Sequence, residues 1–208
     1  DSLRLHTRVR SDSCQYRLDW DYRYNYNNSG FLHGYLTVND SNAFVGGFYP
    51  SSFFLADIPW DLSGGSRWVW DQKALDISDL QISNENQQLT VDGKLSSAEE
   101  DKLWAKFEGF QLSTINELTE SAANTSLAGE MDGVIGLRSA FSRPGFEAQI
   151  GVDSLFLNGF YLGDLQLDSR MDSLNARVAF TAGIQAGRAQ VLQMQGEVDP
   201  RKDKNSLQ

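Results

Sequence analysis

The segment YRLDWDYRYNY (16–26) alternates two kinds of side chain with a period of two. Aromatic or aliphatic residues occupy every second position, and charged or amide residues lie between them. Successive side chains of a β-strand point to opposite faces of the sheet, so this order predicts a strand with one apolar and one polar face. The same alternation returns at 3–9, 32–38, 89–95, 127–137, 146–152, 176–184 and 192–198. One-sided alternation is typical of antiparallel sheets, whereas buried parallel strands read as continuous apolar runs.

Short segments with turn chemistry separate the alternating segments, which predicts a meander of hairpins. They are NNSG (27–30), SGG (63–65), SNEN (83–86), SSAEED (96–101) and SRPG (142–145). One segment departs from the period of two. In STINELTESAAN (113–124), Thr114 and Glu117 have the spacing of a capping box, and apolar residues recur every third position. This spacing predicts one short helix near 113–122.

Glycine recurs inside the predicted strands in the pattern apolar-x-Gly-x-apolar. The pattern occurs six times, around Gly34, Gly93, Gly129, Gly133, Gly159 and Gly196. A glycine within a strand marks a bulge, a bend or a close backbone approach, so the repetition favours a curved sheet. The fold class expected is therefore all-β, a long curved antiparallel sheet with one apolar face. Alternation alone leaves open whether that face lines a closed core or an open groove.

Several functional classes fit the sequence poorly. The net charge of −10 disfavours nucleic acid as a partner, because phosphates attract a positive field. The chain has two histidines and one cysteine, without metal-ligand spacing, and shows no nucleophile elbow, P-loop or dinucleotide fingerprint. We therefore expect no enzyme activity, no metal and no cofactor. An outer-membrane barrel would require strands of about ten residues throughout, and several segments here are shorter.

The region 50–172 resembles the repeat region of TamB-like proteins, the translocation and assembly module family related to AsmA. The likeness is carried by the Ser52-to-Trp60 segment, by LDISDLQISNENQQLTVDGKLS (75–96), by the pattern F-x-L-x-x-I-x-x-L (110–118) and by LGDLQLDSR (162–170). The resemblance implies a β-taco, an antiparallel sheet folded lengthwise into a half-pipe with an apolar interior. It also implies that residues 1–208 are a single fragment of a longer protein.

The resemblance further implies a place and a role. TamB-like proteins are periplasmic proteins of Gram-negative bacteria, anchored in the inner membrane, that meet an outer-membrane barrel protein of the BamA/TamA type. Parts absent from this chain would make both contacts. The family is associated with phospholipid transport between the two membranes and with outer-membrane protein assembly. The expected partners are therefore phospholipid acyl chains and, through other parts, the barrel protein.

Inward positions of the predicted strands are the candidate groove-lining residues. They are Trp20, Tyr22, Leu36, Ile77, Val91, Leu95, Phe107, Met131, Ile135, Ile150, Val152, Val178 and Phe180. Two alternatives remain open, both of them non-catalytic protein-binding modules. One is a chaperone that binds barrel precursors by strand augmentation, and the other is a closed cell-surface β-sandwich with a dry core.

Overall fold

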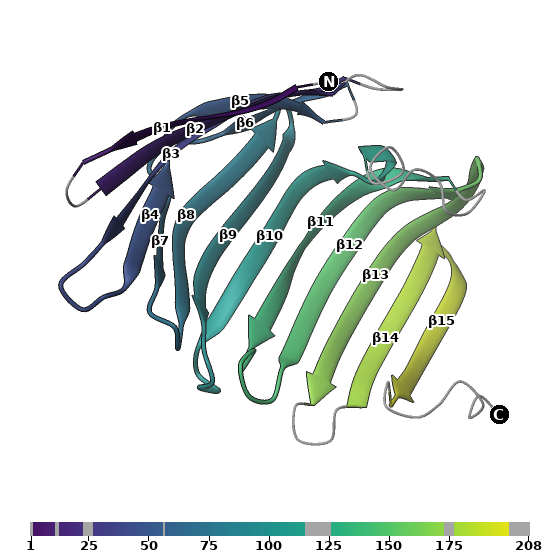
Figure 1. Cartoon of the computed structure of the whole chain (residues 1–208). Coiled ribbons are helices and arrows are strands. Elements are labelled where there is room, and N and C mark those ends of the chain that lie inside the picture. The colour runs from purple at the N-terminus through teal and green to yellow at the C-terminus, as the bar shows by residue number, and fades with distance from the viewer. Residues whose placement is uncertain are drawn as a thin grey trace.

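The computed structural model describes residues 2–10, 13–22, 27–55, 57–114, 126–172 and 177–199. These residues form one antiparallel sheet of fifteen strands (Figure 1). The strands are β1 (Ser2–Val9), β2 (Ser13–Tyr22), β3 (Asn28–Val38), β4 (Phe44–Phe48), β5 (Ser51–Leu55), β6 (Ile58–Leu62), β7 (Arg67–Trp70), β8 (Leu75–Asn84), β9 (Gln87–Leu95), β10 (Lys102–Gln111), β11 (Leu127–Arg138), β12 (Gly145–Leu157), β13 (Phe160–Asp172), β14 (Arg177–Ala186) and β15 (Ala189–Val198). The prediction of an all-β antiparallel fold is confirmed.

The sheet is almost a pure meander. Its order runs β1-β2-β3-β4-β7-β8-β9-β10-β11-β12-β13-β14-β15, so most neighbours in the sheet are neighbours in the chain. The hairpin of β5 and β6 leaves this path, with β5 beside β3 and β6 beside β8. Figure 1 shows β8 to β15 bending along their length, and the β5–β6 hairpin lies at the upper end of β8 and β9. Fifteen strands in one sheet differ from the two packed sheets of a β-sandwich.

The bends coincide with bulges at residues with positive φ. The pairing shifts register between Ile77 and Leu80, between Phe107 and Phe110, and between Val152 and Leu155. Each interval contains one residue with φ between 51° and 59°, namely Asp79, Gly109 and Ser154. A bulge of this kind bends its strand and increases the local twist. Sheet curvature therefore has a defined local cause in β8, β10 and β12.

Five of the six patterned glycines lie in strands, and Gly159 lies in the turn between β12 and β13. Gly93 and Gly129 have positive φ, and Gly129 lies at the register shift between Ala128 and Glu130. Other strand glycines receive an aromatic ring from the neighbouring strand: Tyr16 over Gly34, Trp68 over Gly46, Trp104 over Gly136 and Phe180 over Gly196. A ring over a glycine packs in the space that a side chain would occupy, so these glycines make room for aromatic side chains as well as permit curvature.

The predicted helix begins at Leu112, and residues 112–114 are helical. The rest of the predicted span, from Ile115 on, lies outside the described residues. The assignment of Thr114 to a capping box is wrong in position, because the helix has already begun two residues before it. The Thr114 side chain is buried, and its hydroxyl donates to Gln87 Oε1 at 3.2 Å. The same oxygen accepts the backbone N–H of Gln111 at 2.9 Å, so Gln87 of β9 holds the start of the helix.

Candidate functional site

One apolar face runs through every strand of the sheet. Directly opposed residues of an antiparallel pair lie on the same face, so the register follows that face from strand to strand. It passes from Leu5 to Leu18 and Leu32 at one edge, and from Val152 to Leu165, Ile184 and Leu192 at the other. All thirteen predicted groove-lining residues belong to this face by register: Trp20, Tyr22, Leu36, Ile77, Val91, Leu95, Phe107, Met131, Ile135, Ile150, Val152, Val178 and Phe180. Their role as ligand lining stays a prediction.

The apolar face is closed at one end by a packed core. Trp60 from β6 stacks on Phe110 from β10, with ring centroids 6.1 Å apart. Leu112, Met131, Val152, Leu155 and Ile184 complete this cluster, which we call the end core. Met131 and Val152 are 8 % and 2 % exposed, so a ligand reaches them only by displacing these neighbours. Two of the thirteen predicted lining residues are therefore buried inside the end core.

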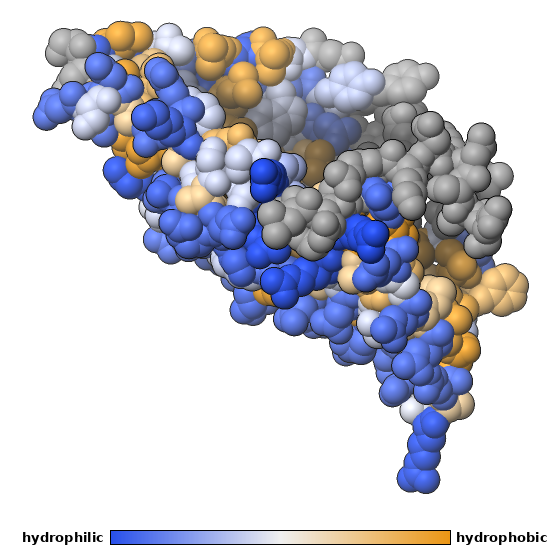
Figure 2. Space-filling model, turned by 90° about the horizontal axis from the view of Figure 1, so that it is seen from below, coloured by the Kyte–Doolittle hydropathy of each residue, from blue (hydrophilic) through white to orange (hydrophobic). Residues whose placement is uncertain are grey.

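The rest of the apolar face is less covered. Eleven of the thirteen predicted residues are half-buried or exposed, with Tyr22 at 50 %. Large apolar side chains on the two edge strands are exposed too: Leu3, Leu5 and Val9 of β1, and Leu192, Met194 and Val198 of β15. Figure 2 shows hydrophobic residues gathered at the left, over the N-terminal strands, and at the right, over the C-terminal strands. The apolar face thus extends beyond what the protein itself buries.

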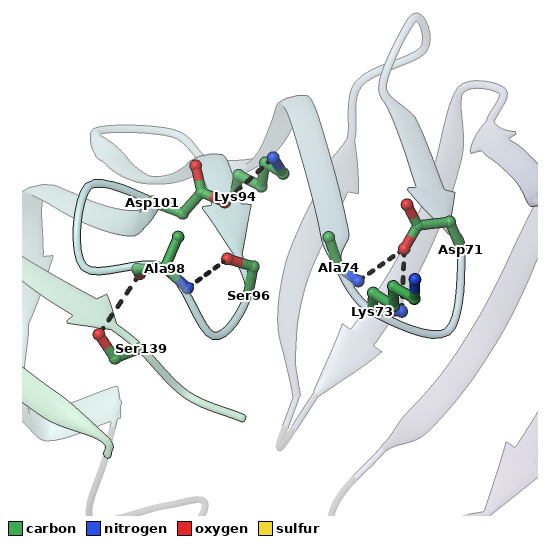
Figure 3. A network of polar contacts seen from close by, with 8 residues as sticks. All are labelled: Asp71, Lys73, Ala74, Lys94, Ser96, Ala98, Asp101 and Ser139. Atoms are coloured by element: carbon green, nitrogen blue, oxygen red, sulfur yellow. Dashed lines mark hydrogen bonds and ion pairs between the residues drawn. The ribbon is translucent and has the colours of Figure 1, made fainter. Parts of the chain in front are cut away.

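Polar contacts fasten the loops at the end of the sheet away from the end core (Figure 3). The Asp71 carboxylate accepts the backbone N–H groups of Lys73 and Ala74 at 2.9 and 2.6 Å, and these bonds hold its pKa below the ordinary range. Asp101 pairs with Lys94 at 3.0 Å. The Ser139 hydroxyl donates to the Ala98 carbonyl at 3.3 Å, joining the loops after β9 and β11. The β9–β10 and β11–β12 loops are therefore joined to each other, and the β7–β8 loop is held by its own bonds.

The opposite face of the sheet is polar and carries a hollow of about 780 Å³ across β10 to β15. Its floor comes from outward side chains of these strands, among them Trp104, Gln149, Asp168, Thr181 and Gln195. Lys102 crosses one rim, with Nζ 2.6 Å from Glu147 Oε1, and this contact holds the pKa of Glu147 below its ordinary value. Alternation in the sequence does not predict this hollow, because it assigns such residues only to a solvent face. One feature of the sequence does point to the hollow: Trp104 is an aromatic residue at a polar-face position.

The described histidines and acidic residues are spread over the sheet. Across the described ranges, no group of three or more His, Cys, Asp and Glu side chains lies together. His6 Nε2 lies 3.8 Å from Asp19 on the outer face of β1 and β2, and His33 packs on the Tyr49 ring with centroids 4.6 Å apart. Within the same ranges, no helix has the length and hydropathy needed to cross a bilayer.

No family model, no curated protein and no solved structure matches this chain.

Proposed function

We propose that this chain is a segment of a TamB-like protein of the Gram-negative periplasm, in which the sheet folds lengthwise as a β-taco. Its apolar face shelters phospholipid acyl chains while their head groups stay in water. In this proposal, an inner-membrane anchor and an outer-membrane barrel partner of the BamA/TamA type belong to other parts of the protein. The observation that carries the proposal is the continuity of one apolar face through fifteen strands, with exposed apolar side chains at both edges.

The free energy of burial makes such a face a suitable path. Each CH₂ removed from water contributes about 0.8 kcal/mol, so a 16-carbon chain gains on the order of 10 kcal/mol on a continuous apolar surface. That gain opposes release into water. Movement along the face costs little where neighbouring positions are chemically similar, as the paired residues Ile150 and Leu167 are. The end core covers this face at Met131 and Val152, so we place lipid on the part of the face that stays accessible.

The test compares opposite faces of the same strand. Ile150→Asp places a carboxylate on the apolar face, and Gln149→Asp places one on the polar face of the adjacent position. Thr90→Asp and Val91→Asp form a second matched pair on β9. The protein is incubated with vesicles of phosphatidylethanolamine and phosphatidylglycerol, recovered and examined by native mass spectrometry. We expect bound phospholipid in the wild type and both controls, and at least a fivefold loss in Ile150→Asp and Val91→Asp. Equal occupancy in all five proteins would refute the proposal.

A second candidate function is a chaperone for barrel precursors by strand augmentation, and the two sheet edges favour it. Among the described strands, β1 pairs only with β2 and β15 pairs only with β14. Each edge therefore offers unpaired backbone N–H and C=O groups to an extended segment of another chain. A photocrosslinker at Leu5 of β1 and another at Val91 separate the two functions. Adducts to barrel precursors at Leu5 support augmentation, and lipid adducts at Val91 support transport.

A further inference from the structure

The hollow on the polar face has the form of a shallow channel across the strands. Its floor residues follow the register in one row, with Gln149 opposite Asp168, Asp168 opposite Thr181, and Thr181 opposite Gln195. The row therefore crosses four adjacent strands, which lie about 4.8 Å apart. A ligand that contacts the whole row must be extended and run across the strands.

The row presents polar groups that are available for hydrogen bonds. Among the described residues, no hydrogen bond or ion pair occupies the side chains of Gln149, Asp168, Thr181 or Gln195. Together they offer two amides, one carboxylate and one hydroxyl, a mixture of donors and acceptors at regular spacing. Such a mixture suits a ligand that carries both donors and acceptors along its length.

An aromatic ring lies at the β10 end of this channel. A Cβ built on Gly136 of β11 would lie 2.5 to 3.0 Å from three ring atoms of Trp104, so the indole lies over the backbone of the neighbouring strand. Lys102 Nζ is 5.1 Å from the ring centroid and is occupied by its ion pair with Glu147. The Trp104 side chain is only half-buried, so part of the ring faces the channel. An indole held in this way can stack on an apolar ring face of a ligand.

The charges around the channel are matched. Three carboxylates line it, those of Glu147, Asp168 and Glu197, and one guanidinium, that of Arg170. Two further cations balance them, because Lys102 pairs with Glu147 and Arg177 Nη1 lies 3.5 Å from Glu197 Oε2. A site with balanced charge gives neither anions nor cations a large electrostatic advantage. The channel therefore favours a neutral ligand.

We propose that the polar face binds an extended neutral oligosaccharide, which stacks one sugar ring on Trp104 and hydrogen-bonds its hydroxyls to the row from Gln149 to Gln195. Sugar hydroxyls are both donors and acceptors, and a pyranose presents an apolar C–H face to an aromatic ring. The oligosaccharide can be free or can be the head group of a glycolipid. This site lies on the opposite face of the sheet from the proposed acyl-chain path, and neither proposal depends on the other.

The test measures binding of maltohexaose, cellohexaose and chitohexaose to the full chain by isothermal titration calorimetry and by the indole N–H signals in NMR. We expect at least one hexasaccharide to bind and to shift the Trp104 signal. Trp104→Ala should weaken that binding at least tenfold, Trp104→Phe less, and Asp168→Ala and Gln195→Ala severalfold each. Trp68→Phe, a change to a ring that lies over Gly46 on the apolar face, is the control and should leave the affinity unchanged.

Two further ligands separate the possible sources and the alternatives. The first is monomeric dodecyl maltoside. If Trp104→Ala weakens its binding and Ile150→Asp does not, the detergent binds through its sugars, which supports a glycolipid source. The opposite pattern assigns the detergent to the apolar face and overturns the glycolipid source. Circular dichroism must show that each variant is folded, and Trp104→Phe keeps an aromatic ring over Gly136. The proposal is overturned if none of the hexasaccharides binds, if binding survives Trp104→Ala in a folded protein, or if polyphosphate binds more tightly than every sugar.

Discussion

The backbone N–H of Gly109 on β10 donates to the carboxylate of Asp132 on β11, with N and Oδ1 2.9 Å apart. The bulge that contains Gly109 leaves this N–H outside the regular ladder, and the carboxylate provides its acceptor. The same relationship recurs in the hairpins before and after, from Asp79 to Asp92 at 3.2 Å and from Ser154 to Asp164 at 2.9 Å. Each donor has positive φ, and each acceptor lies on the next strand. Three successive hairpins thus share one device for bending the sheet.

Replacing the acceptor should destabilise the sheet locally. In Asp132→Ala the Gly109 N–H loses its charged acceptor, and we expect the free energy of unfolding to fall by about 1 to 2 kcal/mol. Asp132→Asn keeps an acceptor oxygen and should cost less. Urea denaturation followed by circular dichroism measures both changes. Asp40→Ala is the control, because Asp40 lies exposed in a turn, and it should have little effect. An Asp132→Ala protein as stable as this control would show that the bulge needs no cap.

Two glycines of the same sheet should respond in opposite ways to alanine. At Gly136 the added Cβ would lie 2.5 Å from the Trp104 ring, so the indole must move, and such overpacking costs about 1 to 3 kcal/mol. At Gly183 the nearest atom is 3.9 Å away and φ is not in the left-handed region, so alanine fits the strand. There we expect no loss, or a gain of about 0.5 kcal/mol from the less flexible unfolded chain. Thermal unfolding of the two variants distinguishes the sites, and equal losses would contradict the argument.

The alternating pattern predicted the faces of the sheet because a period of two determines which side chains share a face. Val91, Ile135 and Val178 lie on one face as their positions in the sequence require. The strand order was also predictable, since short turns join neighbours. The detour of β5 and β6 was not, because the pairing of Leu62 with Ile82 is a contact between distant segments that no local pattern encodes.

The candidate sites were predictable to different degrees. The apolar face followed from alternation, but the burial of Met131 and Val152 depends on Trp60 and Leu112, which reach them only in the folded sheet. The polar hollow depends on the position of Trp104 over Gly136, residues 32 positions apart in the sequence that β10–β11 pairing brings together. Sequence alternation could show that Trp104 faces outward, but not what it covers.

Trp60 should be the residue on which the end core depends most. It is 5 % exposed and stacks on Phe110, so Trp60→Ala leaves a large cavity and should cost about 3 to 5 kcal/mol. Its buried indole N–H finds no acceptor in the described part of the chain. Trp60→Phe removes that unpaired donor, which stabilises the fold, and removes part of the ring, which destabilises it. The free energy of unfolding should therefore fall by only about 1 kcal/mol. Chemical denaturation measures both, with the exposed Phe54→Ala as control. If Trp60→Phe lowers the free energy of unfolding as much as Trp60→Ala does, the indole N–H has a hydrogen-bond acceptor in solution.

Acid should loosen the loop between β7 and β8 through Asp71. The backbone N–H groups of Lys73 and Ala74, with the nearby Lys94 and Lys73 charges, favour the ionised carboxylate and hold its pKa below that of the unfolded chain. A lowered folded-state pKa contributes stability that is present above the unfolded pKa, about 3.9 for an aspartate, and is lost as pH falls below it through the folded-state pKa. Asp71→Asn keeps an acceptor oxygen but no longer titrates. We expect it to be less stable than the wild type at pH 7, and we expect this difference to shrink as pH falls below about 4, in urea midpoints measured at each pH. The urea midpoint of Asp40→Asn should change with pH as that of the wild type does. If the midpoints of Asp71→Asn and the wild type differ by the same amount at every pH, Asp71 is not the source of the acid sensitivity.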